Sequence, residues 1–66
     1  MKIWLNGERV DVPRARSVAE LAASYGLHPN SILIEHNGVA LRRREWPEQK
    51  LQEDDRLEFV RVVAGG

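Results

Sequence analysis

Two Asn-Gly pairs, at residues 6–7 and 37–38, each separate two short runs of residues that favour β-strands. Asn-Gly is the strongest short-range hairpin signal, because the type I′ turn of a two-residue hairpin loop needs positive φ at both central positions. We therefore predict two antiparallel hairpins. Their strands are expected at residues 2–5, 8–12, 32–36 and 39–41.

Between the hairpins the sequence predicts one helix, at residues 18–25. Ser17 and Glu20 have the spacing of a capping box, in which the serine oxygen accepts a backbone N–H at the start of a helix. Gly26 lies where a left-handed residue commonly ends a helix. Apolar residues recur between them at helical spacing and form one stripe, which consists of Val18, Leu21, Ala22 and Tyr25.

After the second hairpin the sequence predicts a loop and one more strand. Residues 42–50 are polar around Trp46, and we expect a crossing loop with one 3₁₀ turn, anchored by Trp46 and Leu51. A turn at residues 53–55 precedes a last strand at 57–63. Side chains alternate along a strand, so Leu57 and Phe59 share one face of it, and the other face carries Glu58, Val60 and Val62.

This order of elements predicts an α+β domain, a single mixed sheet of about five strands with one helix packed on one face. The chain has 66 residues and 42% of them are hydrophobic, enough for one small core with little left to line a deep pocket. These values favour a binding or carrier module over an enzyme with an interior active site. We predict one domain at residues 1–63 and a flexible tail at 64–66.

Composition argues against several other classes. Ten basic residues balance ten acidic ones, whereas proteins that bind nucleic acid or membrane surfaces are usually basic. Cysteine is absent, which excludes disulfides, zinc knuckles and thiol nucleophiles. No apolar run approaches a membrane span and no secretory signal is evident. We expect a cytoplasmic protein that binds no metal.

The sheet face away from the helix is expected to carry apolar side chains, namely Val60, Val62, Trp4 and Leu33. Contiguous exposed apolar patches usually mark protein contacts, so this face is a candidate partner surface. The alternative is that the middle loop covers it, with Trp46 as the covering side chain.

Two polar features have weaker functional interpretations. Three adjacent arginines at residues 42–44 could hold phosphates, but the acidic turn at 53–55 could neutralise them, and a solvated loop is the favoured interpretation. His28 and His36 are treated as ordinary polar residues, because they stand eight residues apart in different elements and are too few for a metal site without carboxylates.

The C-terminal sequence Ala64-Gly65-Gly66 is the strongest candidate site. A strand runs almost to it, and glycine has no Cβ, so such a tail fits a channel too narrow for side chains. This arrangement suits a carboxylate that enters another protein's active site. A carboxylate must first be activated, for example as an acyl-adenylate, and the chain has no Walker loop to bind ATP. The alternative is a frayed, inert terminus.

Four segments together resemble the ThiS family, the sulfur carriers of thiamin biosynthesis. They are Ser-Val-Ala-Glu-Leu at 17–21, Glu-His-Asn-Gly at 35–38, Trp46, and Leu-Glu-Phe-Val-Arg-Val-Val-Ala-Gly-Gly at 57–66. The resemblance covers the whole chain and implies a ubiquitin-like β-grasp fold. The chain departs from the family pattern at Arg42, where proline is common, and at Asp54, where glycine is common.

The resemblance also implies a mechanism. An E1-like adenylyltransferase of the ThiF type would use ATP to adenylate the Gly66 carboxylate. Sulfur from a partner's persulfide would then displace AMP and leave a thiocarboxylate, which would supply sulfur to a thiazole synthase of the ThiG type. Gly65 and Ala64 would give access, and Glu58, Val60 and Val62 would dock the partner. The protein would be a monomeric carrier and cosubstrate that binds no cofactor itself.

Three other functions remain open at this stage. The chain could be a sulfur carrier of another pathway, such as a molybdopterin synthase small subunit or a tRNA-thiolation carrier. It could be a β-grasp interaction module with an inert tail. It could also bind RNA weakly through the arginines at 42–44, although its zero net charge argues against this.

Overall fold

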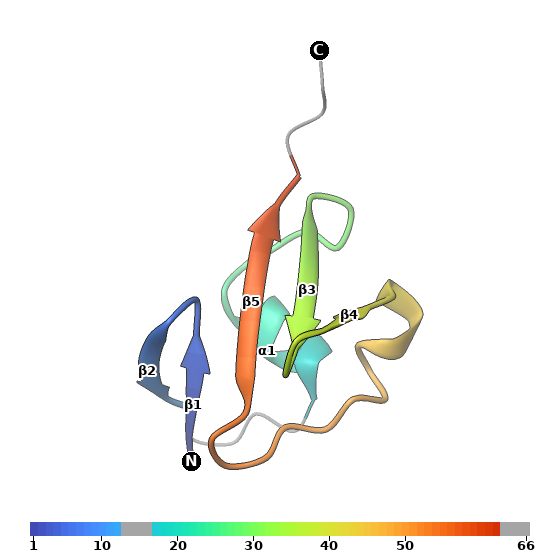
Figure 1. Cartoon of the computed structure of the whole chain (residues 1–66). Coiled ribbons are helices and arrows are strands. Elements are labelled where there is room, and N and C mark those ends of the chain that lie inside the picture. Colours follow the sequence, from blue (N-terminus) through green and yellow to red (C-terminus); the bar gives the residue numbers. More distant parts are fainter. Residues whose placement is uncertain (13–16, 63–66) are drawn as a thin grey trace.

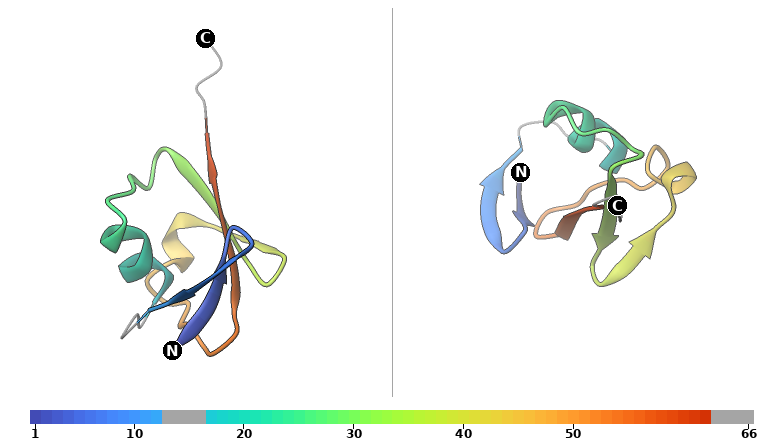
Figure 2. Two further views of the ribbon diagram at one scale, coloured as in Figure 1. Left: turned by 90° about the vertical axis from the view of Figure 1, so that its left-hand side faces the viewer. Right: turned by 90° about the horizontal axis from the view of Figure 1, so that it is seen from above.

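The computed structural model describes residues 1–12 and 17–62 of the chain. In this part of the chain one α-helix packs against one face of a five-stranded sheet (Figures 1 and 2). The predicted α+β architecture is thereby confirmed. In chain order the elements are β1 (Lys2–Leu5), β2 (Glu8–Asp11), α1 (Val18–Ser24), β3 (Ile32–His36), β4 (Val39–Leu41), the 3₁₀ helix η1 (Arg43–Glu45) and β5 (Arg56–Arg61).

The strands lie in the order β2-β1-β5-β3-β4, so the last strand along the chain is the central strand of the sheet. β5 runs parallel to β1 and antiparallel to β3, and the two hairpins β1–β2 and β3–β4 are antiparallel. The sheet is therefore mixed, as predicted. β5 begins one residue earlier than expected and ends at Arg61, while residue 63 of the predicted strand lies outside the described residues.

Both hairpin turns have the backbone that their Asn-Gly sequences predict. The φ values are 50° and 82° at Asn6 and Gly7, and 51° and 84° at Asn37 and Gly38. Positive φ at both central residues defines the type I′ turn, whose twist matches that of the flanking strands. Local sequence therefore determines where both hairpins turn.

The helix begins and ends with the predicted signals. The Ser17 Oγ accepts a hydrogen bond from the Glu20 backbone N–H at 3.1 Å. At the other end Gly26 has φ of 68°, and the Leu27 N–H donates to the Ala22 carbonyl at 3.2 Å in a Schellman motif. The helix stops one residue earlier than predicted, because Tyr25 is its C-cap.

The core lies between α1 and the sheet. Its largest fully buried side chains are Ile3, Ile34, Leu57 and Val18. Trp46 and Leu51 anchor the crossing loop as predicted, and the Trp46 carbonyl accepts from the Ala19 N–H at 3.1 Å. Trp46 is only 3% exposed within this core, so the alternative in which it covers the opposite sheet face is wrong.

Candidate functional site

The candidate site begins where β5 leaves the sheet. β5 lies between β1 and β3, and beyond its last residue the Val62 N–H still donates to the Ser31 carbonyl at 2.8 Å. Backbone hydrogen bonds therefore fix the chain up to Val62. The predicted tail residues Ala64, Gly65 and Gly66 lie outside the described residues, so their roles remain predictions from the sequence.

Three predicted partner-binding residues lie on the face of β5 that points away from the helix. Glu58 is exposed, and Val60 and Val62 are each 45% exposed, whereas Leu57 is buried and Phe59 is partly buried. The predicted alternation along β5 is therefore confirmed. The contact of these residues with a partner remains a prediction.

Leu33 of β3 extends the apolar part of this face. It lies directly opposite Val60 in the β3–β5 register and is 60% exposed. We call Leu33, Val60 and Val62 the β3–β5 patch. Because this patch stands at the end of β5 that leads to the tail, a protein that contacts it is well placed to reach the tail.

Two carboxylates lie beside the patch. Glu58 is directly opposite Glu35 in the β3–β5 register, and neither side chain forms an ion pair with any residue in the described part of the chain. Like charges in directly opposite positions destabilise a sheet. The fold therefore gains nothing from the charge of Glu58, which remains available for a basic partner side chain.

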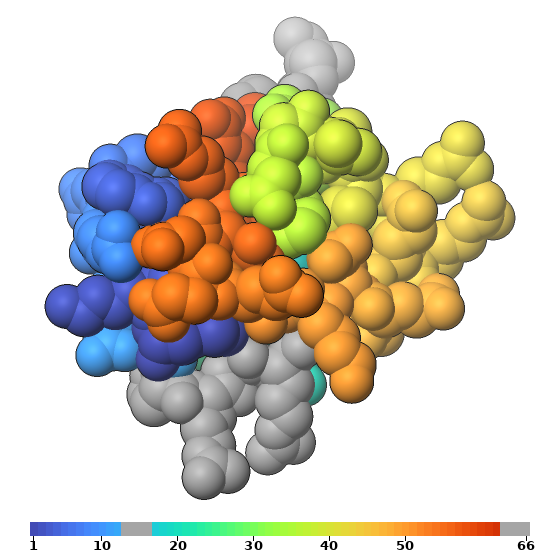
Figure 3. Space-filling view, turned by 60° about the horizontal axis from the view of Figure 1, so that its bottom comes forward, coloured from blue at the N-terminus to red at the C-terminus, as the bar shows by residue number. Residues whose placement is uncertain are grey.

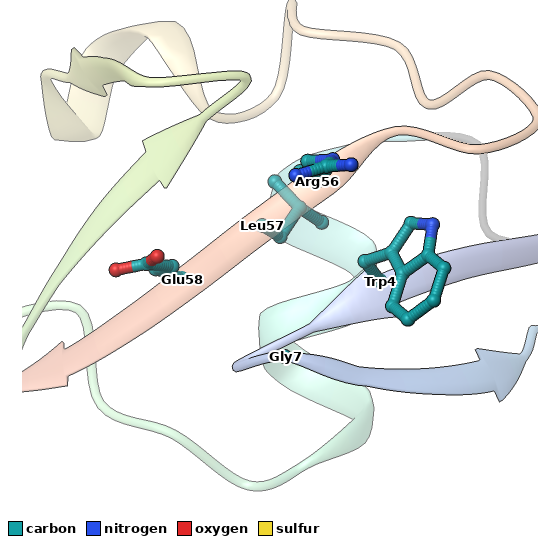
Figure 4. Close-up of a pocket in the computed structure, with 5 residues that line it drawn as sticks. All are labelled: Trp4, Gly7, Arg56, Leu57 and Glu58. Atoms are coloured by element: carbon teal, nitrogen blue, oxygen red, sulfur yellow. The ribbon is translucent and has the colours of Figure 1, made fainter.

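The opposite end of the same face carries an aromatic and basic cluster. The guanidinium carbons of Arg9 and Arg56 lie 5.3 Å and 6.0 Å from the centroid of the Trp4 ring. Trp4, Arg56 and Glu58 help to line a shallow pocket of about 240 Å³ between the first hairpin and β5 (Figure 4). The sequence predicted Trp4 on this face but not its arginine neighbours. Arg9 could have been found from the hairpin register, which places it opposite Trp4.

Asp55 holds the chain at the start of β5. Its side chain is buried and accepts hydrogen bonds from His36 Nε2 at 2.9 Å, Asn37 Nδ2 at 3.2 Å and the Gln52 N–H at 2.9 Å. Burial raises the pKa of Asp55, but these hydrogen bonds outweigh it, and the pKa is lowered overall from 3.8. His36 is therefore a structural polar residue, and His28 is exposed.

The arginines at residues 42–44 are exposed, and Figure 3 shows the segment after β4 projecting from the side of the molecule. The acidic turn does not neutralise them, because Asp54 pairs with Arg9 at 2.7 Å instead. That part of the solvated-loop interpretation was wrong. Arg43 donates to Asn30 Oδ1. Among the described residues no three side chains of metal-binding type lie together, and no helix is long and apolar enough to cross a membrane.

A comparison with known families tests the resemblance that the sequence analysis described. The model of the ThiS family matches residues 3–66. The chain belongs to the ThiS family. This is the family of sulfur carriers that the sequence resembles, and the match extends over the whole Ala-Gly-Gly terminus.

Solved structures of ThiS agree with this assignment. The crystal structure of the thiamine biosynthesis protein ThiS from Geobacter metallireducens is 28% identical, covers both chains completely and superposes with a TM-score of 0.84. A solution structure of a thiamine biosynthesis protein from the same organism covers all of this chain and 88% of its own, with a TM-score of 0.80. The β-grasp fold is confirmed.

A curated relative extends the comparison beyond small proteins. A thiazole synthase of Magnetococcus marinus is 33% identical over 66 residues, which is all of this chain but 20% of that protein. The chain therefore spans one fifth of the length of this relative.

The structure accounts for one of the two departures from the ThiS pattern. Asp54, where the family often has glycine, has φ of 69°. Aspartate tolerates this left-handed conformation better than most residues, and its carboxylate pairs with Arg9. The turn before β5 therefore keeps the backbone that glycine would favour.

Proposed function

We propose that this ThiS-family protein carries sulfur as a thiocarboxylate on Gly66. The observation that carries the proposal is the family match, which runs through residue 66 and so includes the Gly-Gly terminus. The open face and the fixed end of β5 support it, because a partner that docked there would lie next to the start of the tail. The protein acts as a carrier and cosubstrate and performs no catalysis itself.

The chemistry divides into activation and sulfur transfer. An E1-like adenylyltransferase binds ATP, and the Gly66 carboxylate attacks the α-phosphorus, releasing pyrophosphate and forming an acyl-adenylate. The terminal sulfur of a partner's cysteine persulfide then attacks the carbonyl carbon, and AMP leaves. A second thiol reduces the resulting acyl disulfide, which frees the thiocarboxylate and leaves a disulfide on the sulfur donor.

The small residues of the tail allow access to the catalytic channel, and the open face binds the partner. Gly65 and Ala64 present little or no side chain, so the tail fits a narrow catalytic channel. Glu58, Val60 and Val62 contact the activating enzyme. ATP is bound by that enzyme, and this chain contributes only the carboxylate.

The proposed sulfur acceptor is a thiazole synthase. The support is the Magnetococcus relative, a thiazole synthase with a segment that matches this whole chain. A carrier and its acceptor that occur within one polypeptide are held at high effective concentration. No observation favours molybdopterin synthesis or tRNA thiolation over this acceptor.

The absence of cysteine makes the proposal directly testable. After incubation with ATP, an E1-like enzyme and a persulfide donor, the intact protein should gain about 16 Da, because sulfur replaces oxygen. Since the chain has no cysteine, iodoacetamide at mildly acidic pH should then alkylate only the thiocarboxylate. No alkylation of the wild-type protein would reject the proposed function.

Two controls separate this result from artefacts. Oxidation of Met1, the single methionine, also adds about 16 Da, so the mass gain must be located in the C-terminal peptide. Deletion of Gly66 should abolish the alkylation. Gly65→Val should block adenylation while leaving the melting temperature nearly unchanged, and a large loss of stability would contradict a tail that is free of the body.

A further inference from the structure

β5 extends beyond the strand that pairs with it on one side. Its parallel register with β1 consists of Trp4 opposite Arg56 and Leu5 opposite Leu57, and β1 then turns into the first hairpin. On the other side β3 follows β5 as far as Arg61. In the described part of the chain, the last residues of β5 therefore have no strand on the β1 side (Figure 1).

The hydrogen-bond pattern shows which backbone groups face this open side. The Leu57 carbonyl accepts from the Asn6 N–H at 2.9 Å, and the Phe59 N–H donates to Asn6 Oδ1 at 2.8 Å. Val62, by contrast, donates toward β3. Because successive residues of a strand direct their N–H and C=O groups to opposite sides, Arg61 faces the β1 side, as Leu57 and Phe59 do.

The end of β5 therefore offers a short open edge. Its groups are the Phe59 carbonyl and the N–H and carbonyl of Arg61, which span about 7 Å along the strand. No described residue accepts a hydrogen bond from the Arg61 N–H. The Phe59 N–H already donates to the Asn6 side chain, which takes the place of a neighbouring strand at that point. The open edge begins directly after this hydrogen bond.

A groove of about 430 Å³ runs beside this edge on the helix side of the sheet. Its apolar walls include Leu27, Phe59 and Tyr25, and the rings of Phe59 and Tyr25 meet edge to face at 6.3 Å. Tyr25 is 49% exposed although the helical spacing predicted it on the buried stripe. Arg61 also lines the groove, and its guanidinium forms no ion pair with any residue of the described ranges.

We propose that this edge binds an extended segment of the thiazole synthase that accepts the sulfur, by addition of a strand to β5. The incoming backbone bonds to the Phe59 carbonyl and to Arg61. One of its side chains is apolar and fills the groove beside Tyr25 and Leu27, and another is acidic and pairs with the Arg61 guanidinium. Strand addition of this kind takes its affinity from main-chain hydrogen bonds and its specificity from alternate side chains.

This inference rests on the proposed function for the identity of the partner. The charge and shape of the groove favour an apolar and acidic segment, and the edge lies three residues before Ala64. A partner strand bonded there holds the start of the tail in a fixed direction. The edge also leaves the β3–β5 patch uncovered, so the two surfaces can be tested separately.

The first test measures the Arg61 amide itself. Without an intramolecular acceptor, this amide should exchange rapidly with solvent deuterium in the free protein. On saturation with a purified thiazole synthase that has no ThiS-like segment of its own, its exchange should slow at least about tenfold. An Arg61 amide that stays unprotected in the saturated complex overturns the proposal.

The second test removes the Arg61 N–H. The chain is short enough for chemical synthesis with an ester in place of the amide between Val60 and Arg61. The ester also weakens the Val60 carbonyl, which faces Leu33 of β3, so the melting temperature should fall slightly. The affinity for thiazole synthase should fall about fivefold, which corresponds to the loss of one hydrogen bond. The matched control is an ester between Glu58 and Phe59, which weakens the Glu58 carbonyl in the same way and loses the bond from the Phe59 N–H to Asn6, so it should lower stability without lowering the affinity. Equal affinity of the Arg61 ester and the native protein rejects strand addition.

Two further results would show that another molecule occupies the edge, or that no molecule occupies it. Protection of the Arg61 amide that rises with the concentration of this protein alone would mean that a second copy occupies the edge, and would reject thiazole synthase as the occupant. Normal sulfur transfer with an unprotected Arg61 amide would reject this inference and leave the proposed function intact. The affinity measurements use the carboxylate form, so they remain valid if no thiocarboxylate forms.

Discussion

Asp55 connects the β3–β4 hairpin to the turn before β5 through one carboxylate. It receives hydrogen bonds from the β3–β4 hairpin through His36 and Asn37 and from its own turn through the Gln52 N–H. The Asn37 side chain in turn accepts from the Arg56 N–H at 2.8 Å. This network fixes the first residue of β5 against the second hairpin, and thereby sets the register of the strand that leads to the tail.

Asp55→Asn should therefore destabilise the fold. The amide retains one acceptor oxygen and places an NH₂ group among donors, so we expect a loss of about 1–3 kcal/mol. Chemical unfolding at pH 7 measures it. Asp11→Asn, which changes an exposed carboxylate near the N-terminal amine at 3.4 Å, is the control and should cost less than about 0.5 kcal/mol. Equal effects of the two substitutions would contradict the role of Asp55.

The same residue predicts how stability depends on pH. Its pKa in the folded protein is lowered from 3.8, so the ionised carboxylate contributes fully above about that pH and its contribution is lost as the pH falls through the lower folded value. The difference in melting temperature between the wild type and Asp55→Asn should therefore shrink below about pH 4. A constant difference from pH 7 to pH 2 would contradict this assignment.

Side-chain pairs of this kind could not be predicted from the sequence. His36 and Asp55 were interpreted separately, as a polar strand residue and a turn residue, and they lie 19 positions apart. Their contact depends on the β3–β5 register, which is a property of the assembled sheet. The same reason explains why Asp54 was assigned to the wrong arginines, since Arg9 reaches it only once β1 and β5 lie side by side.

The helix α1 contains only seven residues. Isolated helices of this length are unstable in water, so the caps and the packing against the sheet must stabilise it. Ser17 contributes both to the cap and to the attachment of the helix to the rest of the molecule. It caps the helix through Oγ, and its buried backbone forms a β-bridge with Lys50 in the crossing loop.

Removal of the cap should cost more than removal of a similar hydroxyl inside the helix. We expect Ser17→Ala to lower the free energy of unfolding by about 1 kcal/mol, because the Glu20 N–H loses its acceptor. Ser24→Ala is the matched control, since its hydroxyl donates back to the Leu21 carbonyl, which stabilises helices little. Urea unfolding compares the two variants, and a larger loss for Ser24→Ala would reject the cap as the main contribution.

Elements with local signals were predicted well. Asn-Gly turns, the Ser17 cap and Gly26 act within four or five residues of chain, so the sequence places both hairpins and the helix to within about one residue. Tyr25 was predicted on the buried stripe, but the helix ends before it and its ring turns toward Phe59. Helical spacing carries no information beyond the last turn of the helix.

For the molecule as a whole, β5 brings two separate surfaces to the base of the tail. The β3–β5 patch lies on the open sheet face, and the Tyr25–Phe59 groove lies beside the strand on the helix side. The open face followed from side-chain alternation in the sequence. The groove did not, because it depends on β1 being shorter than β5 and adjacent to it.

A charge placed in the patch should separate docking from folding. Val60→Asp should weaken binding of the activating enzyme by at least about tenfold, since a carboxylate would be buried in an apolar contact. Its effect on folding should match that of Val39→Asp, a control on β4 where the valine is 63% exposed and lies outside the patch. The Michaelis constant for adenylation and the melting temperature measure the two effects. Normal adenylation of Val60→Asp would reject the patch as the docking surface.

The central place of β5 has a consequence for biosynthesis. Among the strands of the described sheet, β1 is made first and its parallel neighbour β5 is made last, so the sheet cannot close until residues 56–61 have been made. Nascent chains that stop before β5 lack Leu57 from the core and cannot complete it. Translation must therefore pass residue 61 before the described body can fold, and a product that stops earlier lacks the strand that joins the two hairpins.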